Sequence, residues 1–129
     1  TATRWSNVLA LHAAVRRAIE AAAREDGHGV VVMSHISHSY PDGASLYFTF
    51  VFERDLTREI AQLRTMKEAA SRAISENGGT ISHHHGVGED HAHWLPPEKG
   101  ALGMDALRAL KDRLDPEGVM NPGKLLRRV

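Results

Sequence analysis

Residues 29–53, GVVVMSHISHSYPDGASLYFTFVFE, contain two runs of β-branched and aromatic residues on either side of a Pro-Asp-Gly turn. Such runs are typical of β-strands, and the short turn between them predicts an antiparallel pair. Side chains alternate between the two faces of a strand. The second run is therefore predicted to bury one set of alternate residues: Leu46, Phe48, Phe50 and Phe52.

The segments around this pair carry helical periodicity, with apolar residues recurring every three to four positions. The first segment is residues 5–24, and Gly27 is predicted to stop its helix. The second is capped by Asp55 or Thr57 and ends at residues 77–79, and the third is residues 102–114. The faces predicted to be buried include Trp5, Val8, Leu11, Val15 and Ile19 in the first helix, Ile60, Leu63, Met66 and Ile74 in the second, and Met104, Leu107, Leu110 and Leu114 in the third.

Two further segments complete the predicted fold. Residues 80–82 are predicted to form a short strand, and residues 115–129, which are rich in Pro and Gly, an ordered coil. The order helix, two strands, helix, strand, helix predicts an α+β domain with a small antiparallel sheet flanked by helices.

Composition excludes several classes of function. The 16 basic and 16 acidic side chains balance, which argues against nucleic-acid binding, and the absence of cysteine excludes disulfides and thiolate sites. No apolar run is long enough for a membrane span. The 129 residues allow one domain at most, and the abrupt helical start predicts a fragment of a longer, intracellular protein.

The segment SHHHGVG, residues 82–88, places three imidazoles before a glycine turn, and His91 and His93 follow closely. On an extended strand His83 and His85 would share one face, so a zinc or nickel site is one interpretation. The other is proton transfer, because the pKa of histidine lies nearest to neutral pH. Gly86 and Gly88 would let the backbone approach a bound ligand closely.

Tyr40 is a second candidate for chemistry. It ends the first strand at the PDGA turn, so its hydroxyl is predicted to extend from the sheet rather than into the core. His35 and His38 precede it and offer polar partners. The strand and the histidine loop are therefore predicted to meet at one site.

Two long segments now indicate a family. GGTISHHHGVGEDHAHWL at residues 78–95 and LDPEGVMNPGKLL at residues 114–126, together with residues 3–8 and 39–44, resemble the C-terminal part of the FAD-linked oxidases of the vanillyl-alcohol oxidase superfamily. The triple histidine is most similar to the alkyldihydroxyacetonephosphate synthases. The resemblance implies a two-part flavoenzyme whose cap contains an antiparallel sheet over the flavin. It also implies that the FAD-binding domain is absent from these 129 residues, so that this chain alone is inactive.

The resemblance also assigns residues. Tyr40 matches the tyrosine general acid/base of the family, and His83, His84 and His85 match its histidine loop. His85 is the strongest of these assignments, because the wider oxidase group also has a histidine at this position. Non-covalent FAD would be bound mainly by the absent domain, with contacts here from a set of loop residues: Gly86, Gly88, Asn121 and Lys124. No metal ligand is assigned.

The implied reaction exchanges the acyl group of acyl-dihydroxyacetone phosphate for a long-chain alkoxy group, as in ether lipid synthesis. Its partners would be a lipid-like phosphate ester and a fatty alcohol. FAD-dependent oxidation of a 2-hydroxy acid, of the D-lactate or glycolate type, and a histidine-rich metal-binding module remain as alternatives. Residues 126–129 carry no peroxisomal signal, unlike the animal members of the family. The Ala- and Arg-rich composition predicts a bacterial, cytoplasmic protein. Peripheral membrane association and a homodimer are left open.

Overall fold

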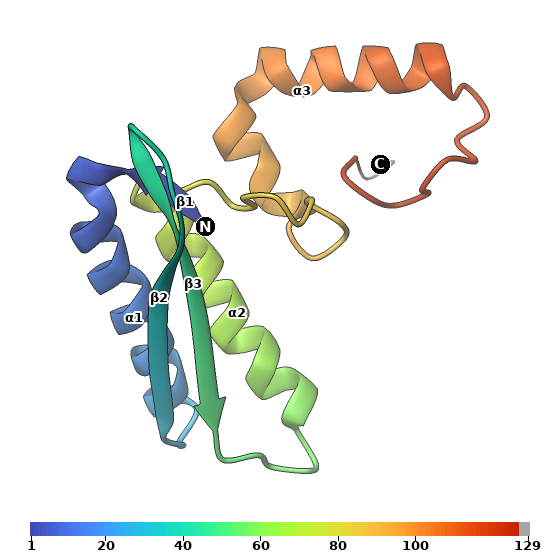
Figure 1. The fold of residues 1–129 in the computed structure, drawn as a ribbon. Helices are drawn as coiled ribbons and strands as arrows, with labels where there is room; N and C mark the ends of the chain where they lie inside the picture. The colour runs from blue at the N-terminus through green and yellow to red at the C-terminus, as the bar shows by residue number, and fades with distance from the viewer. Residues whose placement is uncertain (127–129) are drawn as a thin grey trace. The chain divides into compact units, whose positions relative to one another are not determined.

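A computed structural model describes residues 1–126, and Figure 1 shows their ribbon. The chain forms two compact units, one up to His83 and the other from His84 onward, and each is described by itself. Residues 127–129, which end the predicted coil and belong to the segment without a peroxisomal signal, lie outside the described residues. The first unit contains a three-stranded antiparallel sheet with two long helices, and the prediction of an α+β fold is confirmed.

The sheet has the order β1-β3-β2, from strands β1 (Ala2–Arg4), β2 (Val30–Ser39) and β3 (Gly43–Phe52). The predicted antiparallel pair is confirmed, since Val30 lies opposite Phe52 and Ser39 opposite Ala44. The register shifts between Ile36 and His38, so β2 carries one extra residue at Ser37. This irregularity is a β-bulge, which re-aims the side chains that follow it.

The third strand is not the one predicted. Residues 80–82 form no strand, and Ala2–Arg4 pairs with β3 instead. The amide of Thr80 does donate to the carbonyl of Ala2 over 3.0 Å, but the chain bends at Ile81 before a ladder can form. A strand of three residues has too few positions for alternation to reveal it.

The core of the first unit lies between one face of the sheet and the helices α1 (Val8–Glu25) and α2 (Glu59–Glu76). The face predicted for the second strand is confirmed: Leu46 is buried and the three phenylalanines pack against the core. The best-buried members from the helices are Leu11, Val15, Ile19 and Met66. The opposite face of the sheet is exposed in the described part of the chain and carries Val31, Met33, Tyr47 and Val51.

Two predictions about helix starts and faces are wrong. Trp5 begins a short 3₁₀ turn, Trp5–Asn7, and is 44% exposed, because its Nε1 donates to the carbonyl of Tyr40 over 2.9 Å. In α2, Ile60 and Leu63 are exposed, contrary to prediction, whereas Met66 is buried and Ile74 packs against the core, as predicted.

The loop before α2 explains why the start of the helix buries Gln62 rather than Ile60 and Leu63. Gln62 is buried, accepts a hydrogen bond from the Asp55 amide at 2.9 Å and donates to the carbonyl of Glu53 at 3.3 Å. Its burial fixes which side of α2 faces the core. Neither Asp55 nor Thr57 caps the helix, since Asp55 accepts from the amide and hydroxyl of Thr57 and the N-cap position is Arg58.

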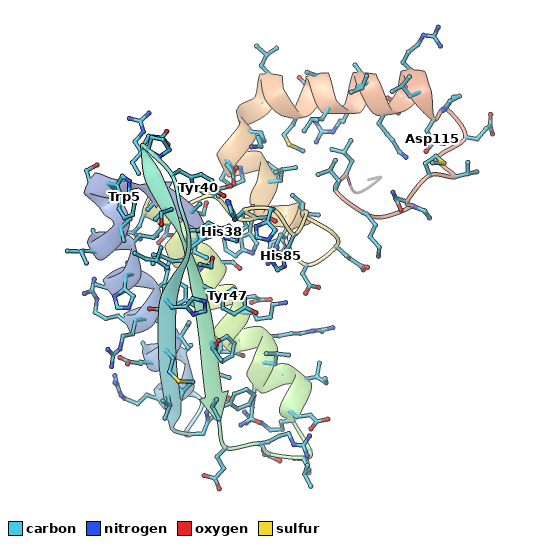
Figure 2. All side chains as sticks on the ribbon, viewed as in Figure 1. Trp5, His38, Tyr40, Tyr47, His85 and Asp115 are labelled. Carbon is cyan, nitrogen blue, oxygen red and sulfur yellow. The ribbon has the colours of Figure 1, made fainter. Side chains whose placement is uncertain are left out.

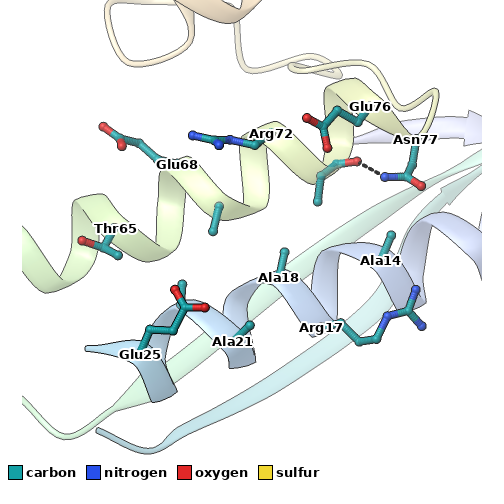
Figure 3. A pocket seen from close by; sticks show the side chains of 13 residues that line it. Ala14, Arg17, Ala18, Ala21, Glu25, Thr65, Glu68, Arg72, Glu76 and Asn77 are labelled. Carbon is teal, nitrogen blue, oxygen red and sulfur yellow. Dashed lines mark hydrogen bonds between the residues drawn. The ribbon is translucent and has the colours of Figure 1, made fainter. Parts of the chain in front are cut away.

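The outer surface where α1 and α2 pack together has an open groove of about 550 Å³, drawn in Figure 3. Alanines line it, among them Ala14, Ala18 and Ala69, with charged side chains such as Arg17 and Glu68 at its edges. The small side chains let the two helices approach closely. None of the residues predicted to act in catalysis or cofactor binding lines this groove.

The second unit contains a 3₁₀ turn, η2 (Ala92–Trp94), and helix α3 (Leu95–Leu114). The helix is interrupted by a kink at Gly100, whose φ is 70°, and its second part follows this kink, close to the predicted start at about residue 102. Met104 is buried as predicted, whereas Leu110 and Leu114 are exposed, so the inward face predicted for the end of this helix is wrong. No helix among the described residues is long and apolar enough to cross a membrane.

The coil predicted after residue 114 is confirmed over residues 115–126, and Asp115 organises its start. The buried carboxylate accepts hydrogen bonds from the Lys111 ammonium and from the amides of Val119 and Met120, both at 3.0 Å. The Lys111 ammonium, together with these two amides, holds the pKa of Asp115 below its ordinary value.

We expect Gly43→Ala to destabilise the first unit, because a Cβ at Gly43 would lie 2.3 Å from the carbonyl oxygen of Thr3 in β1. Relief of that overlap must separate β1 from β3, and the free energy of unfolding should fall by at least about 2 kcal/mol. Urea unfolding followed by circular dichroism measures the change. Gly29→Ala is the matched control, since a Cβ there meets nothing within 4 Å, and equal stability of the two variants would contradict the packing of β1.

The lowered pKa of Asp115 predicts a pH dependence in the second unit. Because the folded pKa lies below the unfolded one, the stabilisation is present above the unfolded pKa, about 3.9, and is lost as pH falls through the folded pKa. At neutral pH Asp115→Asn should therefore speed hydrogen exchange at the amides of Val119 and Met120, and at strongly acidic pH variant and wild type should converge. Asp112→Asn, an exposed neighbour, should leave exchange unchanged. Equal exchange of Asp115→Asn and wild type at neutral pH would show that the carboxylate does not hold the coil.

Candidate active site

Tyr40 and His83 form a hydrogen-bonded pair in the first unit. The Tyr40 hydroxyl lies 2.9 Å from Nε2 of His83, across 43 residues of sequence, and the two rings are 5.7 Å apart and tilted by 60°. Tyr40 is 43% exposed, so the pair is open to a ligand. Figure 2 shows Tyr40 at the end of the β2–β3 pair. The prediction that strand and histidine loop meet is therefore confirmed for these two residues.

The backbone on both sides of Tyr40 is fixed. Its amide donates to the carbonyl of Gly43 over 2.8 Å and closes the turn between β2 and β3, while its carbonyl accepts the Trp5 indole hydrogen bond. The bulge at Ser37 sets the direction of its side chain. Residues opposite each other in an antiparallel pair share a face, and His38 lies opposite Ser45, on the face of Tyr47. Tyr40, two residues on, projects to the same exposed face.

His83 is positioned by the segment before it, which strand β1 anchors. The Thr3 hydroxyl donates to the carbonyl of Gly78 at 2.9 Å, and the Thr1 hydroxyl donates to that of Thr80 at 2.8 Å. Gly79 is needed between them, because a Cβ would lie 2.7 Å from the Thr1 hydroxyl and 2.9 Å from Leu11. These contacts, with the buried side chain of Ile81, bring the chain to His83.

His38 adds a third ring to this cluster. Its ring centre lies 5.4 Å from that of His83 and 6.4 Å from that of Tyr40, to which it is nearly parallel at 7°. Its Nδ1 lies 3.2 Å from the Ser37 hydroxyl and 3.3 Å from the Ser45 hydroxyl. Sequence reasoning identified His38 as a neighbour but missed Ser37 and Ser45, for which the sequence carries no distinguishing signal.

The remaining predicted residues belong to the second unit. His84 and His85 are exposed, with ring centres 4.4 Å apart. Gly86 and Gly88 have φ values of 79° and 60°, which favour glycine, and a Cβ at either would meet nothing within 4 Å. The backbone at both glycines is therefore accessible.

The coil of the second unit returns to this glycine turn. The Leu125 amide donates to the carbonyl of Gly88 at 2.9 Å, and the Lys124 ammonium contacts Glu89 at 2.6 Å. Asn121 has a φ of 46° in the same coil. Two residues predicted to bind the cofactor, Gly88 and Lys124, thus lie at one corner of this unit, while the Lys124 charge is paired with a neighbouring carboxylate.

The structure changes the metal interpretation of the histidines. That interpretation placed His83 and His85 on one face of an extended strand, but residues 83–85 form bends rather than a strand. The stated geometry for two ligands on one face is therefore wrong. The tyrosine–imidazole pair supports proton transfer, because a phenol and an imidazole can each donate or accept at the shared hydrogen bond.

Comparison with known proteins gives the family. The profile described as FAD linked oxidases, C-terminal domain, matches residues 1–125. An alkyldihydroxyacetonephosphate synthase of Trypanosoma brucei brucei is 30% identical over 126 residues, and one of Caenorhabditis elegans is 33% identical over 129; each alignment covers 98% of this chain. Glycolate oxidase subunit GlcD of Bacillus subtilis is 47% identical over 58 residues, 45% of this chain and 12% of GlcD.

The chain spans about a fifth of the length of the two synthases, 21% and 22% respectively. The profile match nevertheless extends over both units and includes the Tyr40–His83 pair and the glycine turn. The chain therefore belongs to the family of C-terminal domains of FAD-linked oxidases.

Proposed function

We propose that the whole protein is an FAD-dependent enzyme of the alkyldihydroxyacetonephosphate synthase type, and that this domain supplies its acid–base group. The observation that carries the proposal is the hydrogen bond of 2.9 Å between Tyr40 and His83. The similarity to two synthases over 98% of the chain supports the substrate class. The reaction exchanges the acyl group of a dihydroxyacetone phosphate ester for a long-chain alkoxy group.

The residues present are suited to a flat, partly apolar cofactor. The exposed face of the sheet carries Val31, Met33 and Val51, and an exposed apolar surface of this kind is typical of a binding face. A Cβ at Gly86 or Gly88 would meet nothing within 4 Å, so glycine there would let a ligand approach the backbone closely. Gly86 and Gly88 of the second unit would contact FAD, which the rest of the enzyme would mainly bind. When bound, FAD supplies an electron-accepting ring that stabilises negative charge at the substrate carbon.

Tyr40 and His83 would move the proton in this reaction. The phenol oxygen of Tyr40 takes the proton from the substrate carbon, and Nε2 of His83 holds the phenol hydrogen while Tyr40 acts as the base. The exposed imidazoles of His84 and His85 would donate hydrogen bonds to the departing carboxylate. The incoming alcohol then loses its proton to the same tyrosine–imidazole pair, which returns one proton to the substrate carbon. The net products are the ether, the fatty-acid carboxylate and one proton released to solvent.

Expression of the full-length protein tests this function. We expect it to bind FAD and to convert acyl-dihydroxyacetone phosphate and a labelled fatty alcohol into a labelled ether product, with release of the fatty acid. Chromatography of the products and the flavin absorbance measure both properties. A full-length protein that binds no flavin, or that binds flavin and never incorporates the alcohol, would overturn the proposal.

FAD-dependent oxidation of a 2-hydroxy acid is a second candidate, favoured by the 47% identity to the glycolate oxidase subunit over 58 residues. Anaerobic titration of the flavin separates the two functions. Lasting bleaching by glycolate or D-lactate indicates net oxidation. Turnover of the phosphate ester without lasting bleaching indicates group transfer.

We predict that Tyr40→Phe and His85→Ala in the full-length enzyme each lower kcat by about 10² or more and leave FAD bound, because each removes a group that handles a proton or a carboxylate. Steady-state kinetics and flavin content provide the measurement. Tyr47→Phe is the matched control, since Tyr47 is also exposed on the sheet, at 49%, and should keep kcat within about twofold. A near-normal rate for Tyr40→Phe would contradict the role assigned to Tyr40. A near-normal rate for His85→Ala would contradict the role assigned to His85.

A further inference from the structure

We propose that His38 is a positioning residue for the Tyr40–His83 pair, held in place by the hydroxyls of Ser37 and Ser45. The inference rests on the proposed function, because it concerns the same acid–base pair. It adds three residues that the similarity to other proteins does not single out.

The bulge in β2 determines the face of the sheet on which His38 lies. In an unbroken strand, His35 and His38 would project to opposite faces, because side chains alternate. The extra residue at Ser37 places His38 on the same face of the sheet as His35, because His38 lies opposite Ser45 and His35 lies opposite Tyr47. His38 and Tyr40 thereby join the exposed face of the sheet, where a substrate can reach them.

The bulge brings together a triangle of polar atoms from Ser37, His38 and Ser45. The hydroxyl oxygens of Ser37 and Ser45 are 2.7 Å apart, and Nδ1 of His38 lies 3.2 and 3.3 Å from them. Ser45 is only 2% exposed, so its hydroxyl hydrogen must be used within the protein. If Nδ1 of His38 accepts, the first serine hydroxyl donates to the second, and the second donates to Nδ1. Both hydroxyl hydrogens then have acceptors inside the triangle.

The ring of His38 connects this triangle to the Tyr40–His83 pair. With Nδ1 as an acceptor, the neutral ring of His38 carries its proton on Nε2. The same ring packs at 5.4 Å from His83 and nearly parallel to Tyr40. The serines thus fix both the tautomer and the tilt of His38, and His38 limits the orientations open to the two rings that share the 2.9 Å hydrogen bond.

A double-mutant cycle in the FAD-bound, full-length enzyme tests this proposal. The variants are His38→Phe, which keeps a ring but removes both nitrogens, Ser45→Ala, and the two combined. We expect each single variant to lower kcat roughly three- to tenfold, the effect of one neutral hydrogen bond, with unchanged KM and flavin content. The double variant should be no slower than the slower single variant, because both act through the same contact. The pH profile of kcat/KM should shift in all three.

The matched controls are His35→Phe, which replaces a histidine stacked on Tyr47 in the same strand, and Ser71→Ala, which replaces a buried serine in α2. Both should keep the wild-type rate and pH profile. Normal kinetics in His38→Phe and Ser45→Ala, or independent losses that multiply in the double variant, would overturn the positioning role. Should His38→Phe fail to fold, Ser45→Ala alone decides, through its rate and pH profile. An inactive Tyr40→Phe beside an unaffected Ser45→Ala would reject this inference and leave the proposed function standing.

Discussion

The pairing of β1 with its two neighbours is the constraint on which the site of the first unit depends. On one side Ala2 pairs with Ser45 of β3, and on the other the carbonyl of Ala2 accepts a hydrogen bond from the Thr80 amide. β1 therefore links the sheet to the segment that follows α2. Because His83 comes three residues after Thr80, this link brings its imidazole to Tyr40 at the end of β2. Two glycines, Gly43 and Gly79, provide the space that the close approach requires.

Much of this fold could be predicted from sequence because its signals are local. The alternation of Phe48, Phe50 and Phe52 identified the buried face of β3, and the glycines at residues 27 and 78 marked the ends of α1 and α2. Other features depend on contacts distant in sequence. The burial of Gln62 at the start of α2 depends on its bonds to the preceding loop, which no periodicity of apolar residues reveals. The pairing of β1 is likewise a long-range property of a short segment.

The residues of the candidate site also fall into those that could be predicted from sequence and those that could not. Tyr40 and the histidine loop could be identified from sequence, because a polar turn after a strand and a run of imidazoles are visible in the letters and resemble a known family. The bulge at Ser37 could not be predicted, since it follows from how β2 aligns with β3. Only that alignment shows why His38 and Tyr40 share a face and why a buried serine lies beside them. The two units also hold different parts of the predicted chemistry: the tyrosine–imidazole pair in the first, and the remaining histidines with the glycine turn in the second.

The most direct test of this account is the ¹⁵N chemical shift of His83 in protein labelled selectively at histidine. We predict that Tyr40→Phe shifts the Nε2 resonance of His83, because the variant removes the hydroxyl from the 2.9 Å hydrogen bond, whereas Tyr47→Phe leaves that resonance in place. A His83 resonance that is the same in wild type and Tyr40→Phe would show that the pair does not form, and would contradict the role given to β1 in bringing the two residues together.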